Sequence, residues 1–416
     1  MHYTPAMALD ELPPERPPAG PGAGTRVLTA VHDATARFAV PAAGGERPHI
    51  LPLVQSAAFD YPDAASADLA ARGQGYLYSR VGNPTVEAFA RVIAELEGGA
   101  GALAFASGMA AISAALLSRV RAGDRILAAD GLYGTSHELL TSFLPRYGVE
   151  ADFVDACDPA AVERALRPTT RVIYVETITN PLVRVPDLPR LAAIARAHDA
   201  ALIVDNTFAT PLLSQPLKHG ATLSLHSASK YLSGHGDLIG GVVVGSDADM
   251  ARVGEVLKIV GGMMDPFCAW LALRGVRTLA LRVERQVASA QLIAATLAET
   301  PGITRVAYPG LRAHPDHEVA QRVLRAPGAM LAFDVGSLAA ARRMYDRARL
   351  VRRAASLGEI DSLFTHPVSF SHRGVPAAER ERAGITEGLL RLSVGIEDPT
   401  DLIDDLLQAL NAAPGL

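Results

Sequence analysis

Short apolar blocks alternate with amphipathic stretches through the middle of the chain. The blocks predict buried strands at Arg125–Ala129, Arg171–Val175, Ala201–Val204, Thr222–Leu225 and Gly241–Val244. Helices are predicted from Pro84-Thr85 to about Gly98-Gly99, from just after Ser107-Gly108, and near Ser136–Tyr147, Pro159–Leu166 and Asp187–His198. Almost wholly apolar strands separated by helices are typical of a parallel sheet covered on both faces. The pattern therefore predicts an α/β fold with a mostly parallel central sheet.

The order of elements changes after about residue 276. A long helix is predicted over Leu279–Glu299, strands at Ile303–Ala307, Ala329–Val335 and Leu389–Val394, and helices near Leu338–Arg349 and Asp401–Asn411. This order predicts a smaller α+β domain with an antiparallel sheet.

The 416 residues are too many for one compact core of ordinary size. We expect a flexible tail at residues 1–24, an extended arm at 25–80 with a helix near Thr25–Val31, a large domain at 81–275 and a C-terminal domain at 276–416. Neither a secretory signal nor a membrane-spanning apolar stretch is evident in the sequence.

Composition narrows the classes of function. The formal net charge is -5, and no basic run would attract nucleic acid or a membrane surface. Two cysteines without a CxxC motif argue against a disulfide scaffold and are typical of a reducing cytoplasm. Among the 39 basic residues the only lysines are Lys218, Lys230 and Lys258, so lysine-dependent chemistry has three candidates.

Lys230 lies in the motif Ser227-Ala-Ser229-Lys230, between a predicted strand and a glycine-rich run. Small hydroxyl residues beside a lysine suit an amine that binds an aldehyde while the serines bind a phosphate. A surface lysine is the alternative. Asp205 ends the predicted strand Ala201–Val204, where it could pair with a pyridinium nitrogen, cap a helix or bind Mg²⁺.

Three further motifs contain candidate binding residues. The turn Ser107-Gly108-Met109 opens a helix whose N-terminus could bind a phosphate, or Ser107 could be a simple helix cap. Tyr133 follows a strand and could stack on a planar ring, or could be an ordinary core or surface tyrosine. Arg391 interrupts an apolar strand and needs an anion, either a substrate carboxylate or a structural ion-pair partner.

No metal site is predicted. His314 and His317 lie in a turn-rich loop and are expected to be solvated surface residues. His226 and His235 flank the Lys230 motif and are expected to be local hydrogen-bond partners. A nicotinamide enzyme is disfavoured because no GxGxxG motif follows the first strand.

Together, these motifs resemble the Cys/Met-metabolism family of pyridoxal 5'-phosphate (PLP) enzymes, which has fold type I. The resemblance runs from about Pro52 to the end of the chain. It rests on Tyr78-Ser-Arg80-Val-Gly-Asn-Pro-Thr85, Ser107-Gly-Met109, Leu132-Tyr133-Gly134, Glu176-Thr-Ile-Thr-Asn180-Pro181, Asp205-Asn-Thr-Phe208, the Lys230 motif, Ser356-Leu-Gly358, His366-Pro367 and Arg391-Leu-Ser-Val-Gly-Ile-Glu397.

The resemblance implies a role for each matching residue. Lys230 would bind PLP as a Schiff base and move protons, Asp205 would face the pyridine nitrogen, and Tyr133 would stack on the ring. The phosphate would be held by Gly108, Met109, Ser227 and Ser229, and by Tyr78 and Arg80 of a neighbouring subunit. Asn180, Ser356 and Arg391 would position the amino-acid substrate. A dimer would then be required, and a tetramer is the family norm.

The resemblance favours a carbon–sulfur lyase that performs γ-elimination on cystathionine or a related homocysteine derivative. The alternatives are γ-replacement of the cystathionine γ-synthase or O-acylhomoserine sulfhydrylase type, and a non-catalytic PLP-binding scaffold. Thr135 stands where methionine γ-lyases resemble one another in having cysteine. Asp361 stands where cystathionine-using members often have glutamate, and it could meet the distal amino group of cystathionine.

Overall fold

The computed structural model of the chain describes residues 21–38, 45–370, 373–374 and 377–411. Most of the tail predicted at residues 1–24 thus lies outside the described residues. Helix α1 (Ala23–Phe38) begins within the predicted tail and extends well beyond Val31, where its prediction ended. The helix is longer because the apolar stripe through Val27, Ala30 and Val31 continues to Ala34, and all four side chains are buried.

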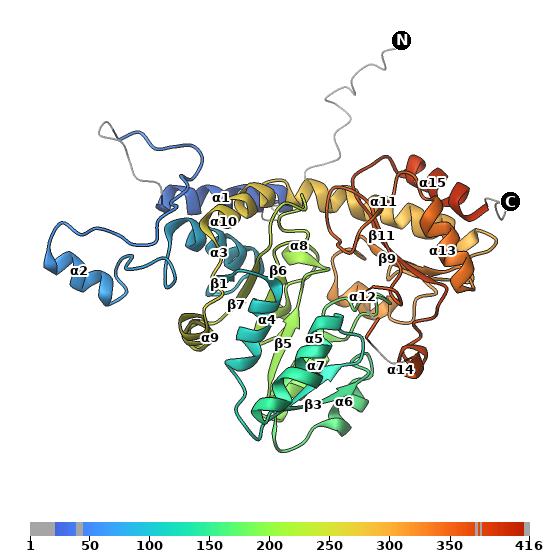
Figure 1. Cartoon of the computed structure of the whole chain (residues 1–416), viewed down its shortest axis with the longest axis horizontal. Helices are drawn as coiled ribbons and strands as arrows, with labels where there is room; N and C mark the ends of the chain where they lie inside the picture. Colours follow the sequence, from blue (N-terminus) through green and yellow to red (C-terminus); the bar gives the residue numbers. More distant parts are fainter. Residues whose placement is uncertain (1–20, 39–44, 371–372, 375–376, 412–416) are drawn as a thin grey trace, which may run out of the picture.

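A seven-stranded sheet forms the centre of the larger part of the chain (Figure 1). Its strands are β1 (Gly101–Phe105), β2 (Arg125–Ala129), β3 (Glu150–Val154), β4 (Thr170–Glu176), β5 (Ala201–Asp205), β6 (Leu223–Ser227) and β7 (Gly241–Gly245). They lie in the order β1-β7-β6-β5-β4-β2-β3. Strands β2 to β6 pair in parallel, whereas β7 pairs antiparallel with both β6 and β1. The predicted mostly parallel sheet is confirmed.

The two edge strands of this sheet were not predicted. Strand β3 has the sequence Glu-Ala-Asp-Phe-Val and none of its residues is buried, so it lacks the apolar signal of a central strand. Strand β1 has the sequence Gly-Ala-Leu-Ala-Phe and pairs with β7, which begins and ends with glycine. Glycine and alanine have low strand propensity, so the sequence signal of β1 is weak.

Helices cover both faces of the large sheet. They are α3 (Pro84–Glu97), α4 (Gly108–Leu117), α5 (Gly134–Glu138), α6 (Pro159–Ala165), α7 (Leu188–Ala197), α8 (Thr210–Leu213), α9 (Asp247–Val260) and α10 (Pro266–Val276). The β6 side chains alternate between the two faces: Ser224 and His226 contact Glu97 of α3, and Ser227 lies against the first residue of α4. Helices α3 and α4 therefore lie on opposite faces.

Local chemistry explains where these helices begin and end. Asn83 caps α3 by accepting the N–H groups of Thr85 and Val86, Pro84 is its first residue, and Gly98 ends it with a φ of 75°. The helix predicted near Ser136–Tyr147 is instead α5 followed by a π-helical segment (Leu139–Phe143) and a 3₁₀ segment (Leu144–Tyr147). Pro145 has no N–H for a regular helical bond there. A further 3₁₀ segment is Pro216–His219.

The C-terminal part contains a five-stranded sheet in the order β10-β11-β12-β9-β8. Its strands are β8 (Arg305–Ala307), β9 (Met330–Asp334), β10 (Arg352–Arg353), β11 (Leu363–Thr365) and β12 (Leu389–Ser393), and all pairs except β10 with β11 are antiparallel. Its helices are α11 (Leu279–Glu299), α12 (His317–Val323), α13 (Leu338–Arg347), α14 (Ala377–Arg382) and α15 (Pro399–Asn411). The predicted antiparallel sheet is confirmed, although the short strands β10 and β11 were missed.

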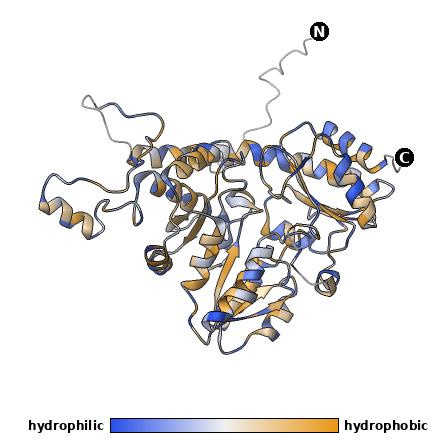
Figure 2. Cartoon of the chain, viewed as in Figure 1, coloured by the Kyte–Doolittle hydropathy of each residue, from blue (hydrophilic) through white to orange (hydrophobic). Residues whose placement is uncertain are grey.

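Buried apolar side chains form one large core around the seven-stranded sheet and a second core around β9, β12, α11, α13 and α15. The strands of the large sheet are the most uniformly hydrophobic elements in Figure 2. The segment with α2 (Ala64–Ala71) extends away from the rest of the chain at one side of the molecule (Figure 1). None of the described helices is both long and apolar enough to cross a membrane.

Candidate active site

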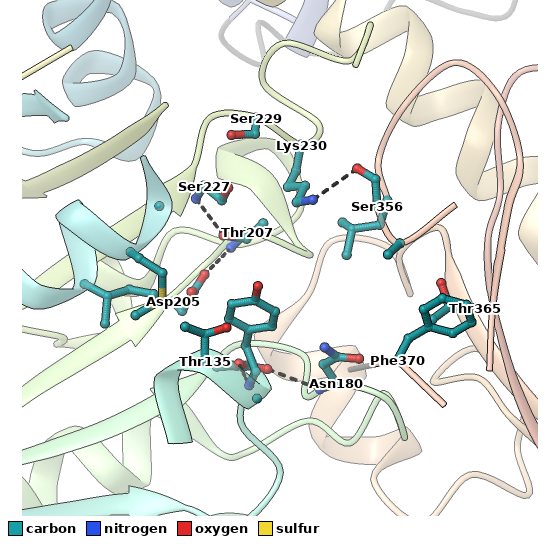
Figure 3. A pocket seen from close by; sticks show the side chains of 18 of the residues that line it. Thr135, Asn180, Asp205, Thr207, Ser227, Ser229, Lys230, Ser356, Thr365 and Phe370 are labelled. Atoms are coloured by element: carbon teal, nitrogen blue, oxygen red, sulfur yellow. Dashed lines mark hydrogen bonds between the residues drawn. The ribbon is translucent and has the colours of Figure 1, made fainter. Parts of the chain in front are cut away.

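A cavity of about 1180 Å³ lies at the carboxyl ends of the parallel strands, between the two sheets. The large sheet lines it with Glu176, Asp205 and Ser227, which end β4, β5 and β6. The C-terminal part contributes Arg391 from β12 and the segment around Ser356. Ten of the lining residues are labelled in Figure 3, with Asp205 and Lys230 on the side of the large sheet and Phe370 opposite them.

Lys230 lies in the loop after β6, and its Nζ donates a hydrogen bond to Ser356 Oγ at 3.1 Å (Figure 3). Burial and the positive charge of Arg391 lower the pKa of the lysine, and the carboxylate of Glu359 opposes them. Burial disfavours the charged form of an amine, so the neutral, nucleophilic form is more available than on a surface lysine. The alternative of a surface lysine is wrong.

Asp205 is the last residue of β5, and its Oδ1 accepts the backbone N–H of Thr207 at 2.9 Å. Burial raises the pKa of this carboxyl, while the hydrogen bonds from Thr207 and the charge of His226 oppose the shift. Thr207 Oγ1 in turn accepts the N–H of Ser227 at 2.8 Å, which links the ends of β5 and β6 (Figure 3). The Asp205 side chain lines the cavity and does not cap a helix.

Glu176 is a second buried acid in the cavity, and no role was predicted for it from the sequence. Its Oε1 accepts the N–H of Tyr133 at 2.7 Å and its Oε2 accepts the N–H of Asn180 at 3.2 Å. Burial, and then the neighbouring charge of Asp205, raise its pKa well above the usual value. The sequence did contain a signal for this acid, because Glu176 ends an apolar strand just as Asp205 does. Through these bonds Glu176 holds two predicted site residues, Tyr133 and Asn180.

The predicted phosphate-binding residues surround the N-terminus of α4. Ser107 caps the helix by accepting the N–H of Ala110 at 3.0 Å, and a Cβ on Gly108 would lie 2.9 Å from Ser227 Oγ. Met109, Ser227 and Ser229 also line the cavity. The Ser229 hydroxyl accepts the N–H of Gly240 at 3.0 Å, so it is already engaged locally. Ser107 caps the helix while the N-terminus of α4 still faces the cavity. A helix cap and a phosphate-binding site are therefore both compatible with this geometry.

Arg391 is buried, and burial lowers its pKa to about 10. Its Nη1 donates to Asn180 Oδ1 at 2.9 Å, and its Nη2 donates to Ser356 O at 3.1 Å and Thr365 Oγ1 at 3.2 Å. No carboxylate of the described residues lies within ion-pair distance, and its Nε has no hydrogen-bond partner among them. The guanidinium therefore has no direct ion-pair partner among the described residues and only the more distant Glu176 opposite it in charge, which favours binding of an anion beside the cavity.

Tyr78 and Arg80 do not line the cavity of their own chain. Tyr78 is 46% exposed, and Arg80 Nη1 donates to the carbonyl of Lys258 at 2.6 Å. Their predicted contribution to a neighbouring subunit's site stays a prediction.

Thr135 and Asp361, the two positions compared with other family members above, differ in their relation to the cavity. Asp361 is exposed and does not line the cavity, whereas Glu359 does line it. The prediction that Asp361 could meet a substrate is therefore not supported by its position. Thr135 lines the cavity, as do Phe370 and Arg373 of the segment that follows His366-Pro367.

The described part of the chain contains no group of three or more histidine, cysteine, aspartate or glutamate side chains that could hold a metal ion. The expectation that His314 is solvated is wrong. His314 is buried, its Nδ1 accepts the N–H of Asp316 at 3.2 Å, and burial lowers its pKa to about 4. The expected local hydrogen bond is confirmed for His235, which bonds Ser233 O. His226 also makes a hydrogen bond, but its partner is the distant Glu97 Oε1 and not a neighbour in the chain.

Comparison with known proteins gives consistent matches over most of the chain. A family model described as Cys/Met metabolism PLP-dependent enzyme matches residues 42–411. An L-methionine gamma-lyase of Pseudomonas putida is 43% identical over 367 residues, which cover 87% of this chain and 92% of that protein. A cystathionine gamma-lyase of Bacillus subtilis is 41% identical over 364 residues, covering 86% and 93%.

A solved structure from Campylobacter jejuni, described as an O-acetylhomoserine (thiol)-lyase, superposes with a TM-score of 0.87 at 30% identity. The match covers 93% of this chain and 100% of that one, and that structure contains N'-pyridoxyl-lysine-5'-monophosphate.

Proposed function

The chain belongs to the Cys/Met metabolism family of PLP-dependent enzymes. From this membership we propose that the protein is a carbon–sulfur lyase that performs γ-elimination on cystathionine or a related homocysteine-derived amino acid. The cofactor is PLP, the fold is fold type I, and the enzyme acts in sulfur amino-acid metabolism. The observation that carries the proposal is that Lys230, Asp205 and Arg391 line one cavity.

The residues of the cavity fit PLP. Lys230 is an amine whose neutral form is favoured by its surroundings, as attack on an aldehyde requires. The cradle at Gly108, which a Cβ would fill, combines a helix N-terminus with the hydroxyl of Ser227, as phosphate binding requires. Asp205 is the acid that would pair with the pyridine nitrogen, and the exposed ring of Tyr133 would stack on the cofactor.

The overall reaction breaks the Cγ–S bond of the substrate, consumes water, and yields a thiol, a 2-oxo acid and ammonia. When bound, PLP supplies an electron sink for the negative charge that develops on the substrate. Arg391, held by Asn180 and Thr365, binds the substrate α-carboxylate through its free donors. Lys230 Nζ accepts the α-proton and later returns a proton, with Ser356 Oγ as its hydrogen-bond partner.

Glu359 supports cystathionine as the substrate. It is half-buried, it lines the cavity, and no ion pair with it is found among the described residues. Its charge acts on Lys230, so a carboxylate lies near the reacting amine. Cystathionine has a second ammonium group that such a carboxylate would bind, whereas methionine has none. We therefore assign distal-ammonium recognition to Glu359 and not to the exposed Asp361.

We propose that a second copy of the chain completes the site. Arg80 and Tyr78 lie on a segment joined to the end of α9 by the Arg80–Lys258 bond. Close to them in the chain, Val81 is 47% exposed, and at the end of α9 Ile259 and Val260 are 82% and 71% exposed. Large exposed apolar side chains that cluster in this way are typical of subunit interfaces. A dimer formed there would provide Tyr78 and Arg80 to the neighbouring cradle.

The function is tested by absorbance and product analysis of the purified protein with PLP. L-cystathionine, L-methionine and an O-acylhomoserine would be added separately, each with and without a thiol acceptor. We expect 2-oxobutyrate and ammonia from cystathionine without a thiol, and loss of activity in Lys230→Ala. Product from the acylhomoserine only when a thiol is present would instead establish γ-replacement. Unchanged activity in Lys230→Ala, or no PLP binding, would contradict the proposal.

The substrate assignment has a matched pair of variants. Glu359→Gln should lower kcat/KM for cystathionine about tenfold or more while changing it little for methionine, because only cystathionine loses an ionic contact. Asp361→Asn, two residues away, should leave both values near those of the wild type. Equal losses of kcat/KM for cystathionine and methionine in Glu359→Gln would show that Glu359 does not bind the distal ammonium group.

A further inference from the structure

On the face of the large sheet that α3 covers, polar side chains form a buried network. Its members, each no more than 1% exposed, are Glu97, Thr177, Asn206, Ser224 and His226. None of them lines the cavity. A buried polar cluster of this size beneath an active site calls for an explanation, because each desolvated group costs free energy unless it is satisfied.

Glu97, the last residue of α3, is the centre of the network. Its Oε1 accepts hydrogen bonds from Asn206 Nδ2 at 2.8 Å, Ser224 Oγ at 3.0 Å and His226 Nε2 at 2.5 Å. Asn206 Oδ1 also accepts from Thr177 Oγ1 at 2.7 Å. The other oxygen of Glu97 has no partner among the described residues. The carboxylate thus ties α3 to the ends of β4, β5 and β6.

Strand alternation connects this network to the cavity. Thr177, Asn206 and His226 are the direct chain neighbours of the cavity-lining residues Glu176, Asp205 and Ser227. Successive side chains of a strand point to opposite faces, so fixing one residue from behind sets the position of its neighbour in front. The N–H of Thr177 also donates to the carbonyl of Asp205 at 2.9 Å, which couples two of these ends.

Stability alone does not account for the arrangement. A buried ion pair can often be replaced by apolar side chains of similar volume without loss of stability. Glu97 also retains an unpaired, fully buried oxygen, which is a cost. In addition, the charge of His226 lowers the pKa of Asp205, against the burial that raises it. The network therefore acts on Asp205 by position, and the charge of His226 offsets only part of the shift that burial causes.

We propose that Glu97 and His226 are positioning residues that hold Asp205 in place for the pyridine nitrogen of PLP from the opposite face of the sheet. The inference rests on the proposed function, since it concerns the same cofactor. Neither residue touches the cavity, so both act through Asp205.

The test compares Glu97→Gln and His226→Gln with the wild-type holoenzyme. His226→Gln can keep a donor toward Glu97 but removes the imidazole ring. The readouts are the dissociation constant for PLP and the ¹⁵N NMR signal of protein loaded with PLP labelled at the pyridine nitrogen. We expect each variant to weaken PLP binding about tenfold and to move the ¹⁵N signal toward that of the unprotonated ring.

Asp316→Asn is the matched control, because Asp316 is also buried and accepts hydrogen bonds from Arg184 Nε at 2.5 Å and Val185 N at 3.0 Å outside the cavity. It should lower the melting temperature without moving the ¹⁵N signal. If Glu97→Gln and His226→Gln lower the melting temperature but keep the wild-type ¹⁵N signal and PLP affinity, the inference is overturned. If Glu97→Gln does not fold, His226→Gln decides alone. If the wild-type protein itself fails to bind PLP, the proposed function fails, and the inference fails with it.

Discussion

At the scale of single residues, the cavity gathers ionisable groups whose surroundings disfavour their charged forms. Burial and Arg391 lower the pKa of Lys230, and burial raises the pKa values of Asp205 and Glu176. Such clusters are typical of active sites, where catalytic groups need pKa values matched to their task. In the absence of cofactor, the charged form of Lys230 therefore lowers the free energy of unfolding.

Replacing Lys230 by methionine should therefore stabilise the apoprotein at about pH 7. The lowered folded-state pKa means that the charged amine destabilises the folded state below that pKa, and that stability rises as the pH passes through it toward the unfolded-state value of about 10.4. The advantage of Lys230→Met should accordingly shrink as the pH rises through this window. Thermal unfolding of the two apoproteins at several pH values measures it.

Lys218→Met serves as the control, because Lys218 is exposed. It should change the melting temperature little at any of these pH values. A Lys230→Met apoprotein that is less stable than the wild type at neutral pH would show that the ammonium of Lys230 is well compensated in the folded protein.

At the scale of elements, the proposed phosphate cradle at the N-terminus of α4 depends on how closely this helix approaches the sheet. A Cβ on Gly241 of β7 would lie 2.3 Å from Ser107 O, and a Cβ on Gly108 would lie 2.9 Å from both the Cβ and the Oγ of Ser227. Only glycine allows the N-terminus of α4 to lie this close to β6 and β7. The helix end, the cap at Ser107 and the serines of the Lys230 motif thus form one unit.

Gly108→Ala should push α4 away from Ser227 and weaken PLP binding about tenfold or more, because the N–H groups at the helix end would no longer meet the phosphate. Equilibrium titration of the apoprotein with PLP measures the effect. Gly254→Ala is the control. Gly254 lies in the middle of α9, and a Cβ there would make only an ordinary 3.5 Å contact with Leu103 of β1. Equal PLP affinity in both variants would contradict a role for this close approach.

Asp405 of α15 holds the turn between α13 and β10. Its carboxylate accepts the N–H groups of Arg349, Leu350 and Val351 at 2.9 to 3.1 Å. Burial alone would raise its pKa, but these hydrogen bonds outweigh burial and lower it. Its contribution to stability is therefore present above the unfolded-state pKa of about 3.9 and is lost as the pH falls through the lower folded-state pKa.

Asp405→Ala should lower the free energy of unfolding by about 2 kcal/mol at neutral pH, because the three N–H groups lose a charged acceptor. The difference from the wild type should diminish in acid, where the wild-type carboxyl is protonated as well. Urea unfolding across this pH range tests both statements. A constant difference at every pH would mean that the charge of Asp405 does not contribute.

At the scale of the whole molecule, the cavity lies between two sheets that belong to different parts of the chain, and Tyr78 and Arg80 lie outside it. The arm with α2 projects from one side of the body (Figure 1). A dimer in which each arm reaches the neighbouring cavity is the arrangement we propose.

This arrangement predicts complementation between inactive subunits. Lys230→Ala and Arg80→Ala should each be inactive or nearly so, but their co-expressed mixture should recover about a quarter of wild-type activity, because half the dimers would contain one site without either substitution. If Arg80 served its own chain, every site would contain at least one substitution and no activity would return. The oligomeric state, measured by light scattering, is the accompanying control.

The sequence by itself determined the central strands, several helices such as α3 and α11, and most of the candidate site. Strands such as Ala201–Asp205 are apolar throughout, so their burial on both faces can be inferred without coordinates. The carboxyl ends of parallel strands meet at one edge, so Asp205, Ser227 and Tyr133 could be expected to lie together before their contacts were known. Lys230 stood out because its motif combines the only nearby lysine with small hydroxyl residues.

Only the tertiary structure decided features that depend on contacts between distant parts of the chain. The edge strands β1 and β3 are stabilised by their pairing partners and not by their own apolar pattern. That Glu359 lines the cavity and Asp361 does not depends on how the segment after Ser356 folds against the lysine loop. Glu97 and His226 lie 129 residues apart, so no local pattern announces their hydrogen bond. Hydrophobic periodicity is a property of neighbouring residues, whereas a buried polar network is set by which elements pack together.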